Sequence, residues 1–418
     1  MYLDSIRLEN FRTFRSAEIA LCHPDQDFHK MEIPRPKLAN INLLLGNNGL
    51  GKSAFLKAVA LAALGPFVGD AGVFPYRLVR REPGEDRARR EKVPGAEARL
   101  KASFTAHAQD RVPGRVKRIE SEIGIQRVED IEKLRWTRSD EAQWRPIYQA
   151  YSAAFFFVGY GATRRVEREE RVDTGARRAS ASVRAQRVQS LFEESYSLMP
   201  LTGWLPGIRE SNPARYAQVQ HLINRLMGVG HYRFTGEMEQ REYLFEHKGL
   251  KVPFRALSDG YRAYIGWIGD LLYHVHTTCP KGTRLLSSRG IVMVDEVDLH
   301  LHPKWQMTVL PVLAKVLPNL QFIVTSHSPL VVGSLEWMNI IVMQPCPGQS
   351  SKPARVRTAV HGMDADQVLL TGLFGMESTR APSKERRLKA LTLRAGEGDL
   401  DAAKRLMKEM SRGIKTPA

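Results

Sequence analysis

Residues 46–53, GNNGLGKS, decide the fold of this chain. They follow a largely apolar run, residues 41–45 (INLLL), and precede a helical pattern that begins at Lys52. A short apolar run of this kind is typical of a buried parallel strand, and the glycines, lysine and hydroxyl after it are those of a phosphate-binding loop. The sequence therefore predicts an α/β fold on a parallel core sheet, with an anion site at the end of one strand.

The chemistry of this loop is local. Its glycines allow positive φ angles that turn N–H groups inward, and the following helix directs its positive end to the same point. Lys52 is expected to bridge the terminal phosphates, and the Ser53 hydroxyl to bind Mg²⁺. For the motif alone, a glycine-rich turn that matches by chance remains an alternative. The predicted phosphate contacts are Gly46, Asn47, Asn48, Gly49, Gly51, Lys52, Ser53 and Ala54.

Two later apolar runs end in polar residues of the same kind of site. Residues 291–294 (IVMV) lead into Asp295 and Glu296, and residues 320–324 (LQFIV) lead towards His327. The carboxyl ends of parallel strands share one edge of a sheet, where ligands bind. We expect Asp295 to hold Mg²⁺, Glu296 to orient or deprotonate the attacking water, and His327 to contact the γ-phosphate. A structural ion pair or a core histidine explains any one of them alone.

A second helix start offers another anion site. Residues 257–262, LSDGYR, open a run with apolar residues at helical spacing. Ser258 is a good N-cap and Gly260 keeps the first turn open, so N–H groups are free there. Near the N-terminus, Phe11, Arg12 and Phe14 are candidates to cover a nucleotide by stacking or by a phosphate contact. A capped core helix, packing aromatics and a surface arginine are the alternative readings.

Composition limits the class of protein. The chain has 418 residues, 43% of them hydrophobic, which permits a large core. No apolar run reaches the roughly 18 residues of a membrane span, and the N-terminus lacks the apolar core of a signal peptide. Three cysteines far apart form no metal or disulfide spacing. These observations favour a cytoplasmic protein with buried free thiols.

The net charge of +17 favours a polyanionic partner, with nucleic acid the leading candidate. Arginines gather in residues 77–118, interpreted as a surface hairpin region, and in residues 164–187, interpreted as a mobile loop. Both segments are candidates to grip phosphates. A solvated basic surface without a specific partner is the alternative.

Taken together, the motifs resemble a known family. Phosphate loop, LSDGYR, IVMVDEVDLHLHP (291–303) and TSHSP (325–329) stand in the order of ABC-type ATPases of the RecF, SMC and OLD group, in particular the compact AAA-type ATPases of bacterial anti-phage systems. The resemblance covers residues 1–345. In it, Lys52 and Ser53 match the Walker A motif, Asp295 and Glu296 the Walker B aspartate and catalytic glutamate, and His327 the switch histidine.

The resemblance implies ATP hydrolysis with Mg²⁺ in a head-to-tail homodimer, in which Ser258 contacts the γ-phosphate held by the other subunit. His300 and His302 then belong to an interface loop and are not zinc ligands. Two departures stand out. Asp259 and Tyr261 replace a glycine and a glutamine of the family signature, and GYGATRR (159–165) holds no glutamine where the family has its glutamine loop.

The chain is also similar to the ATPase subunits of Septu (PtuA-like) and retron defence systems, which work beside an HNH nuclease. This implies a role as a nucleotide-gated dimeric regulator in anti-phage defence, with a nuclease partner and possibly a higher oligomer. A RecF-like repair ATPase that binds DNA directly is the alternative, and a transporter cassette a third. We expect lobe I with an antiparallel β subdomain (1–160), an inserted helical region (161–256), lobe II (257–345), and a helical tail that packs on the core or docks a partner (346–418).

Overall fold

The computed structural model describes most of the chain, in two compact units, residues 1–363 and 364–418. Each unit is described by itself below. The described residues are 1–71, 76–81, 96–110, 112, 117–128, 131–136, 142, 144–145, 147–148, 156–166, 183–228, 232–280 and 282–411.

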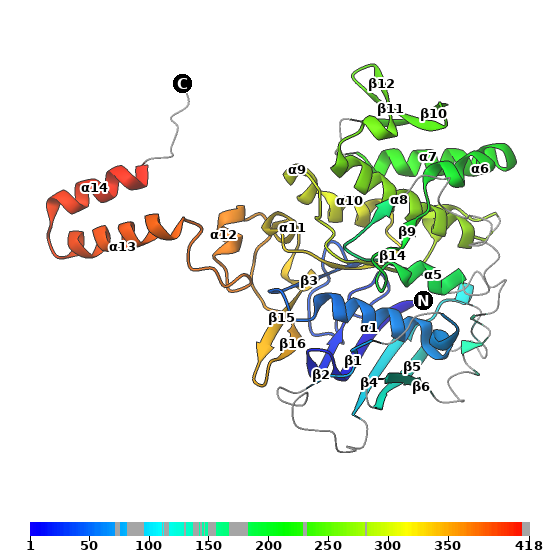
Figure 1. Ribbon diagram of the computed structural model, residues 1–418, viewed down its shortest axis with the longest axis horizontal. Coiled ribbons are helices and arrows are strands. Elements are labelled where there is room, and N and C mark those ends of the chain that lie inside the picture. Colours follow the sequence, from blue (N-terminus) through cyan, green and yellow to red (C-terminus); the bar gives the residue numbers. More distant parts are fainter. Residues whose placement is uncertain are drawn as a thin grey trace. The chain divides into compact units, whose positions relative to one another are not determined.

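The first unit is built on a six-stranded sheet with strand order β16-β15-β3-β14-β13-β7 (Figure 1). Five strands run parallel, and only β16 pairs antiparallel, with β15. The four parallel strands β3, β7, β13 and β14 are buried along their whole length, which explains their near-continuous apolar sequences. The predicted parallel core sheet is therefore confirmed. The strands are β3 (Ile41–Leu45), β7 (Phe156–Tyr160), β13 (Gly290–Val294), β14 (Leu320–Thr325), β15 (Ile340–Cys346) and β16 (Ser350–Ala354).

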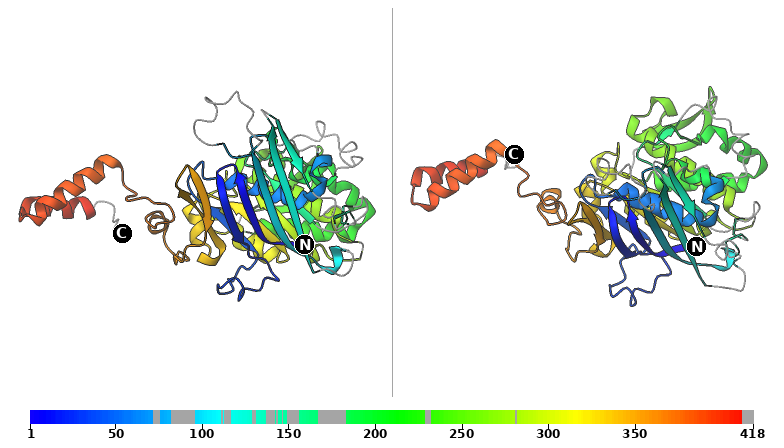
Figure 2. Two further views of the ribbon diagram at one scale, coloured as in Figure 1. Left: turned by 90° about the horizontal axis from the view of Figure 1, so that it is seen from below. Right: turned by 60° about the horizontal axis from the view of Figure 1, so that its bottom comes forward.

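A second, antiparallel sheet has the order β2-β1-β4-β5-β6, and Figure 2 shows its strands side by side in one layer. The two sheets meet where the Ser351 N–H donates to the Thr13 carbonyl, 2.9 Å away. The expected antiparallel subdomain is thus present. Its strands are β1 (Tyr2–Phe11), β2 (Phe14–Ala20), β4 (Glu97–Thr105), β5 (Arg118–Val128) and β6 (Ile131–Arg135).

Helix α1 (Lys52–Leu64) packs on both sheets, against β4 and β5 on one side and β14 and β7 on the other. Apolar residues occur on most of its faces, and its last seven residues, 58–64, are all buried. A helix that is apolar all round needs partners all round. The helix ends at Gly65, whose φ is 55°.

Helices and two small sheets, β10-β11-β12 and β8-β9, stand between β7 and β13 in the chain. The longest helix, α8, packs against β7 and α7. The Asn212 side chain caps α7 by accepting the Arg215 N–H at 3.0 Å. The elements of this region are β8 (Arg165–Val166), α5 (Val183–Gln189), β9 (Ser197–Leu198), α6 (Leu205–Ser211), α7 (Pro213–Leu226), β10 (Arg233–Glu239), β11 (Glu242–His247), β12 (Leu250–Pro253) and α8 (Asp259–Thr278). Between β13 and β15 come α9 (Pro303–Gln306), α10 (Val309–Val316) and α11 (Pro329–Gly333).

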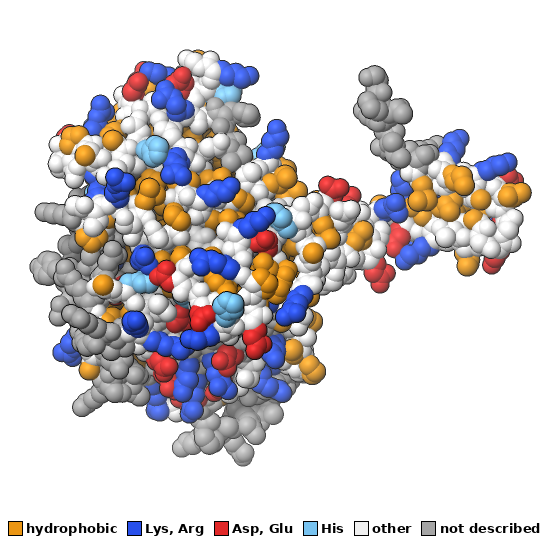
Figure 3. All heavy atoms as spheres, turned by 180° about the vertical axis from the view of Figure 1, so that it is seen from behind, with side chains coloured by type: hydrophobic (Ala, Val, Ile, Leu, Met, Phe, Trp, Pro, Cys, Tyr) orange, Lys and Arg blue, Asp and Glu red, His pale blue; other side chains and the backbone are white. Residues whose placement is uncertain are grey.

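The second unit is helical, with α12 (Ala365–Leu369), α13 (Pro382–Gly396) and α14 (Leu400–Ser411). The last two helices pack on each other. Leu393, Leu400, Met407 and Met410 of this unit are exposed, and Figure 3 shows hydrophobic side chains gathered on the face of it that is drawn.

Candidate active site

The phosphate-loop sequence leaves β3 with the backbone that its glycines were predicted to need. Gly46, Gly49 and Gly51 all have positive φ, and Gly51, at 92°, precedes α1. A Cβ on Gly51 would lie 2.3 Å from Oγ1 of Thr13. The loop therefore packs closely on the turn between β1 and β2, and a residue with a side chain does not fit at position 51. Asn47, Asn48, Gly49 and Ser53 are exposed, whereas Ala54 is half-buried.

Lys52 is 7% exposed. Its ammonium group donates to the Gly46 carbonyl at 2.8 Å and the Asn47 carbonyl at 3.2 Å. Burial lowers the pKa of Lys52, while the negative charges of Asp295 and Glu296 oppose that shift. The lysine thus closes its own loop and faces the carboxylates that follow β13.

Asp295 and Glu296 leave the end of β13 with their backbone held on both sides. The Asp295 N–H donates to the carbonyl of Tyr160 at 2.8 Å, which continues the pairing with β7. The Thr325 hydroxyl at the end of β14 donates to Oδ1 of Asp295 at 2.6 Å and accepts the Glu296 N–H at 2.7 Å. Glu296 has a φ of 49°, so the chain turns sharply there.

His327 follows β14 and is exposed. Partial burial of the imidazole, followed by the charge of Lys52, lowers the pKa of His327, although nearby carboxylates oppose the shift. The fold therefore brings Lys52, Asp295, Glu296 and His327 into electrostatic reach of one another, from three neighbouring strand ends.

Ser258 and Gly260 lie at the start of α8. Ser258 occupies the predicted N-cap position, and its side chain makes no capping hydrogen bond. The hydroxyl is exposed. A Cβ on Gly260 would lie 2.4 Å from the carbonyl oxygen of His300, so the first turn of α8 packs tightly on the loop after Glu296.

The aromatic residues near Arg12 do not cover a nucleotide. Phe11 and Phe14 are completely buried in the core, so stacking on a base is excluded and the packing interpretation is correct. The Arg12 guanidinium donates to the Tyr76 carbonyl at 3.2 Å. Burial lowers the pKa of Lys57, and the charge of Arg12 adds to that shift. Arg12 precedes Thr13, which packs on Gly51 just before α1.

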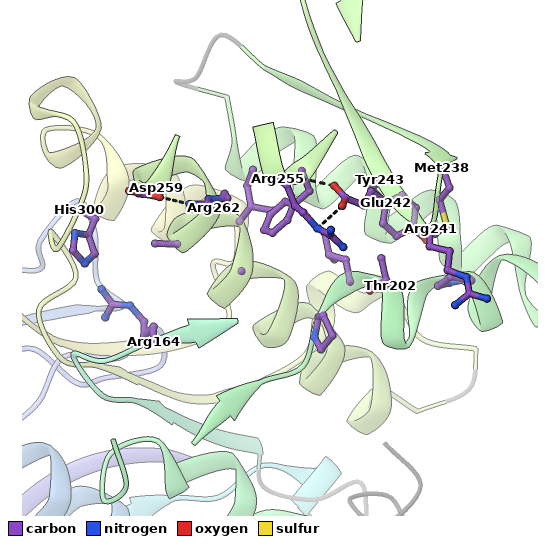
Figure 4. A pocket seen from close by; sticks show the side chains of 17 residues that line it. Arg164, Thr202, Met238, Arg241, Glu242, Tyr243, Arg255, Asp259, Arg262 and His300 are labelled. Atoms are coloured by element: carbon purple, nitrogen blue, oxygen red, sulfur yellow. Dashed lines mark hydrogen bonds and ion pairs between the residues drawn. The ribbon is translucent and has the colours of Figure 1, made fainter. Parts of the chain in front are cut away.

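Beside α8 lies a cavity of about 1150 Å³. Arg164 and His300 lie at one end of it, and Met238 and Arg241 at the other (Figure 4). The Arg164 guanidinium also donates to main-chain carbonyls at the end of β13, so it is part of the site's support.

Sequence reasoning did not assign roles to Thr325 or single out Arg164. For Thr325, a polar residue directly after an apolar run was the available signal, whereas Arg164 stands four residues beyond the end of β7 and had no such signal. Arg164 was expected among the residues of a mobile, phosphate-gripping loop, but it is held on main-chain carbonyls, and Arg187 is buried as well. The rest of the expected loop, residues 167–182, lies outside the described residues, as does much of the basic segment 77–118. Figure 3 shows basic and acidic side chains interspersed on the drawn face of the first unit.

Among the described residues, no group of three or more His, Cys, Asp or Glu side chains is arranged to hold a metal ion. His302 accepts the Lys304 N–H through Nδ1 at 3.3 Å and caps α9.

In the part of the chain that the structure describes, no helix has both the length and the apolar character needed to cross a bilayer.

Residues 41–333 match the family AAA_21, described as "AAA domain, putative AbiEii toxin, Type IV TA system". The chain belongs to this family. The match runs from β3 to the end of α11 and so contains all three strand ends of the site. An ABC-type AAA ATPase of the kind found in defence systems, expected from the motif order, is therefore confirmed.

Curated relatives carry defence-system names. The chain is 23% identical to the Septu protein PtuA of Bacillus mycoides (strain KBAB4), over 90% of this chain and 45% of that protein. It is 35% identical to the retron Ec83 probable ATPase of Escherichia coli, over 28% of this chain and 22% of that protein. The chain thus spans less than half the length of these relatives. Among solved structures, an SMC head domain from Thermotoga maritima aligns over 86% of this chain and 100% of its own, with 16% identity and a TM-score of 0.46.

Proposed function

We propose that this protein hydrolyses ATP and that two copies bind two ATP molecules between them. The observation that carries the proposal is the meeting of three strand ends: the Lys52 loop after β3, the carboxylate pair after β13 and His327 after β14. The loop supplies backbone N–H groups and one ammonium group for the phosphates. Glu296 is assigned as the residue that orients or deprotonates water, and His327 as the γ-phosphate contact.

The oxygen donors present suit Mg²⁺. Ser53 exposes its hydroxyl in the first turn of α1, and Asp295 places a carboxylate held by Thr325 at the end of β13. Mg²⁺ prefers a few such oxygens and completes its shell with water and phosphate, so a cage of protein ligands is not required. Ser53 and Asp295 would hold the ion, which would supply positive charge against the charge that develops on the phosphates. Thr325 keeps Asp295 oriented for that contact.

The position of Ser258 is an argument for the proposed dimer. Ser258 is exposed and makes no side-chain capping hydrogen bond at the start of a 20-residue helix. A helix start with free N–H groups is an anion site. We assign this one, with Gly260, to the γ-phosphate held by the partner copy. Arg12, beside α1, is assigned to the nucleotide of its own chain.

A complementation experiment tests this arrangement. The variants Lys52→Ala and Ser258→Arg should each lose turnover by about 100-fold or more, since each damages every site of a homodimer. A mixture should regain activity, because a mixed dimer contains one site built from intact residues of both chains. Mixing Lys52→Ala with Glu296→Gln is the matched control, and it should stay inactive because both changes fall in the same half-site. Activity in unmixed Lys52→Ala would refute the phosphate-loop assignment, and failure of the first mixture would refute the shared site.

We further propose that the ATPase is a cytoplasmic regulator in anti-phage defence and acts with an HNH-type nuclease. The names of the relatives and the free cysteines support this, and the exposed apolar residues of the second unit offer a surface for docking. The net charge of +17 supports contact with nucleic acid. Co-expression with an HNH protein encoded beside this gene should yield a complex that cleaves DNA. The proposed defence role would be refuted if no complex forms and if cells that express both proteins are not protected from phage. The four relatives considered carry Septu or retron names, so the RecF-like alternative is not favoured.

A further inference from the structure

Arg164 makes an unusual set of main-chain contacts. One terminal nitrogen of its guanidinium donates to the Asp295 carbonyl at 2.6 Å, and the other donates to the Glu296 carbonyl at 2.9 Å. The first nitrogen also lies 3.4 Å from the carbonyl of Gly161. A guanidinium is a rigid planar fork, so its two branches fix the relative orientation of the carbonyls that they bind. One side chain from the segment after β7 therefore holds both residues of the carboxylate pair.

The backbone at this point needs such support. The β13 ladder ends at Val294, and Glu296 adopts a φ of 49°, which is unfavourable for a residue with a Cβ. The Thr325 hydroxyl restrains the pair from the β14 side, through the Asp295 carboxylate and the Glu296 N–H. Arg164 restrains the same two residues from the β7 side, through their carbonyls. Removal of either restraint frees one side of the turn that aims the Glu296 carboxylate.

A guanidinium is always protonated in a protein, and a charged donor makes stronger hydrogen bonds than a neutral one. The segment GYGATRR contains no glutamine, and Arg164 is a long polar side chain of that segment that reaches the carbonyls after β13.

We propose that Arg164 is a positioning residue for ATP hydrolysis, which holds the main chain of Asp295 and Glu296 so that the Glu296 carboxylate faces the attacking water. This inference rests on the proposed ATPase activity. The hydrogen bonds of the Arg164 guanidinium go to the main-chain carbonyls of Gly161, Asp295 and Glu296. Its contribution is therefore expected mainly in turnover and much less in ATP affinity. Arg164 also lines the cavity beside α8 with Asp259 and His300, which connects the carboxylate pair to the helix start assigned to the partner's nucleotide.

The test compares Arg164→Ala with Arg164→Lys and with Arg255→Ala. Arg255 lines the same cavity but pairs with Glu242, which makes it a matched control. Arg164→Ala should lower kcat by about 100-fold, while the Kd for a fluorescent ATP analogue changes by less than about threefold. Arg164→Lys should fall between the two, because an ammonium group reaches one carbonyl at a time. Arg255→Ala should match the wild type.

A second readout separates positioning from general support of the fold. Added methylguanidinium should restore part of kcat in Arg164→Ala and none in Glu296→Gln, in which the carboxylate itself is missing. Unchanged kcat in Arg164→Ala, or parallel loss of kcat and ATP affinity in both Arg164 variants, would overturn the inference and leave the ATPase assignment standing. A wild-type protein without ATPase activity would instead refute the proposed function itself. If Arg164→Ala does not fold, the kcat and Kd of Arg164→Lys decide by the same criteria.

Discussion

The hydroxyl of Thr325 joins Asp295 to the neighbouring strand through a 2.6 Å hydrogen bond to Oδ1, and both residues are buried. The same hydroxyl accepts the Glu296 N–H at 2.7 Å. One small side chain at the end of β14 thus fixes the proposed metal ligand and the backbone of the proposed base. Because Thr325 binds the Asp295 carboxylate and the Glu296 N–H, it restrains both residues at the sharp turn of the chain at Glu296.

Thr325→Val should uncouple this contact while conserving shape. A buried carboxylate that loses a hydrogen bond costs about 1–3 kcal/mol, so we expect that loss in the free energy of unfolding. We also expect a fall in kcat of about tenfold or more. Thr325→Ser keeps the hydroxyl and should stay near the wild type. Urea unfolding and steady-state ATPase assays check both values, and wild-type turnover in Thr325→Val would show that the bond does not orient the pair.

Gly51→Ala should lower the affinity for ATP more than Gly49→Ala does. Both glycines have positive φ, so both substitutions carry a similar backbone cost of about 1–2 kcal/mol. Only at Gly51 does the new methyl group also meet other atoms, Oγ1 of Thr13 and the ring of Phe14, whereas the space around Gly49 is open. Titration with a fluorescent ATP analogue measures the difference. Equal affinities for the two variants would mean that the contact with the β1–β2 turn does not shape the loop.

Acid should weaken the attachment of α8 to β7. Asp270 on α8 accepts the Tyr160 hydroxyl at 2.8 Å and the Met199 N–H at 2.7 Å, and it lies 3.3 Å from His274. Burial alone would raise the pKa of Asp270, but His274 and these donors outweigh it and hold that pKa below its usual value. A lowered pKa in the folded state adds stability at pH values above about 4, and that stability is lost as pH falls further, towards the folded-state pKa.

Asp270→Asn tests this sign. The variant should be less stable than the wild type at pH 7 by about 1–3 kcal/mol, because an amide replaces a charged acceptor. Below about pH 4 its stability should fall less steeply with pH, since the titrating group is gone. Urea unfolding between pH 3 and pH 7 gives the change of unfolding free energy with pH for the variant and for the wild type. A steeper acid loss in the variant than in the wild type would contradict the assignment.

The imidazole of His327 reports on Lys52. Burial, and after it the charge of Lys52, lowers the pKa of His327. Lys52→Met removes a positive neighbour and should raise that pKa towards 6.5, only in part because the burial remains. NMR titration of the imidazole protons measures the shift, with His327→Gln used to identify the resonance. An unchanged value would place Lys52 too far away for the two residues to share one site.

Local sequence was sufficient for the strand ends of the site. The predicted strand at residues 41–45 and the start of α1 at Lys52 agree with the structure, because a loop of glycines between an apolar strand and an apolar helix has few other conformations. The strand β5 was not predicted, although Ile119, Ile123 and Ile125 alternate with polar residues and are buried. That alternation was the available signal, and the surrounding basic residues concealed it.

The sequence by itself determined the α/β class, the parallel core strands and the identity of the residues that end them, since spacing and apolar runs are local properties. Tertiary structure alone decided which of those ends meet. It placed Thr325 against Asp295, set Arg164 on the carbonyls after β13, and buried Phe11 and Phe14. These outcomes depend on the order of strands in a sheet and on close packing between segments far apart in the chain. No local pattern encodes them, because hydrogen-bond partners and burial are properties of the assembled fold.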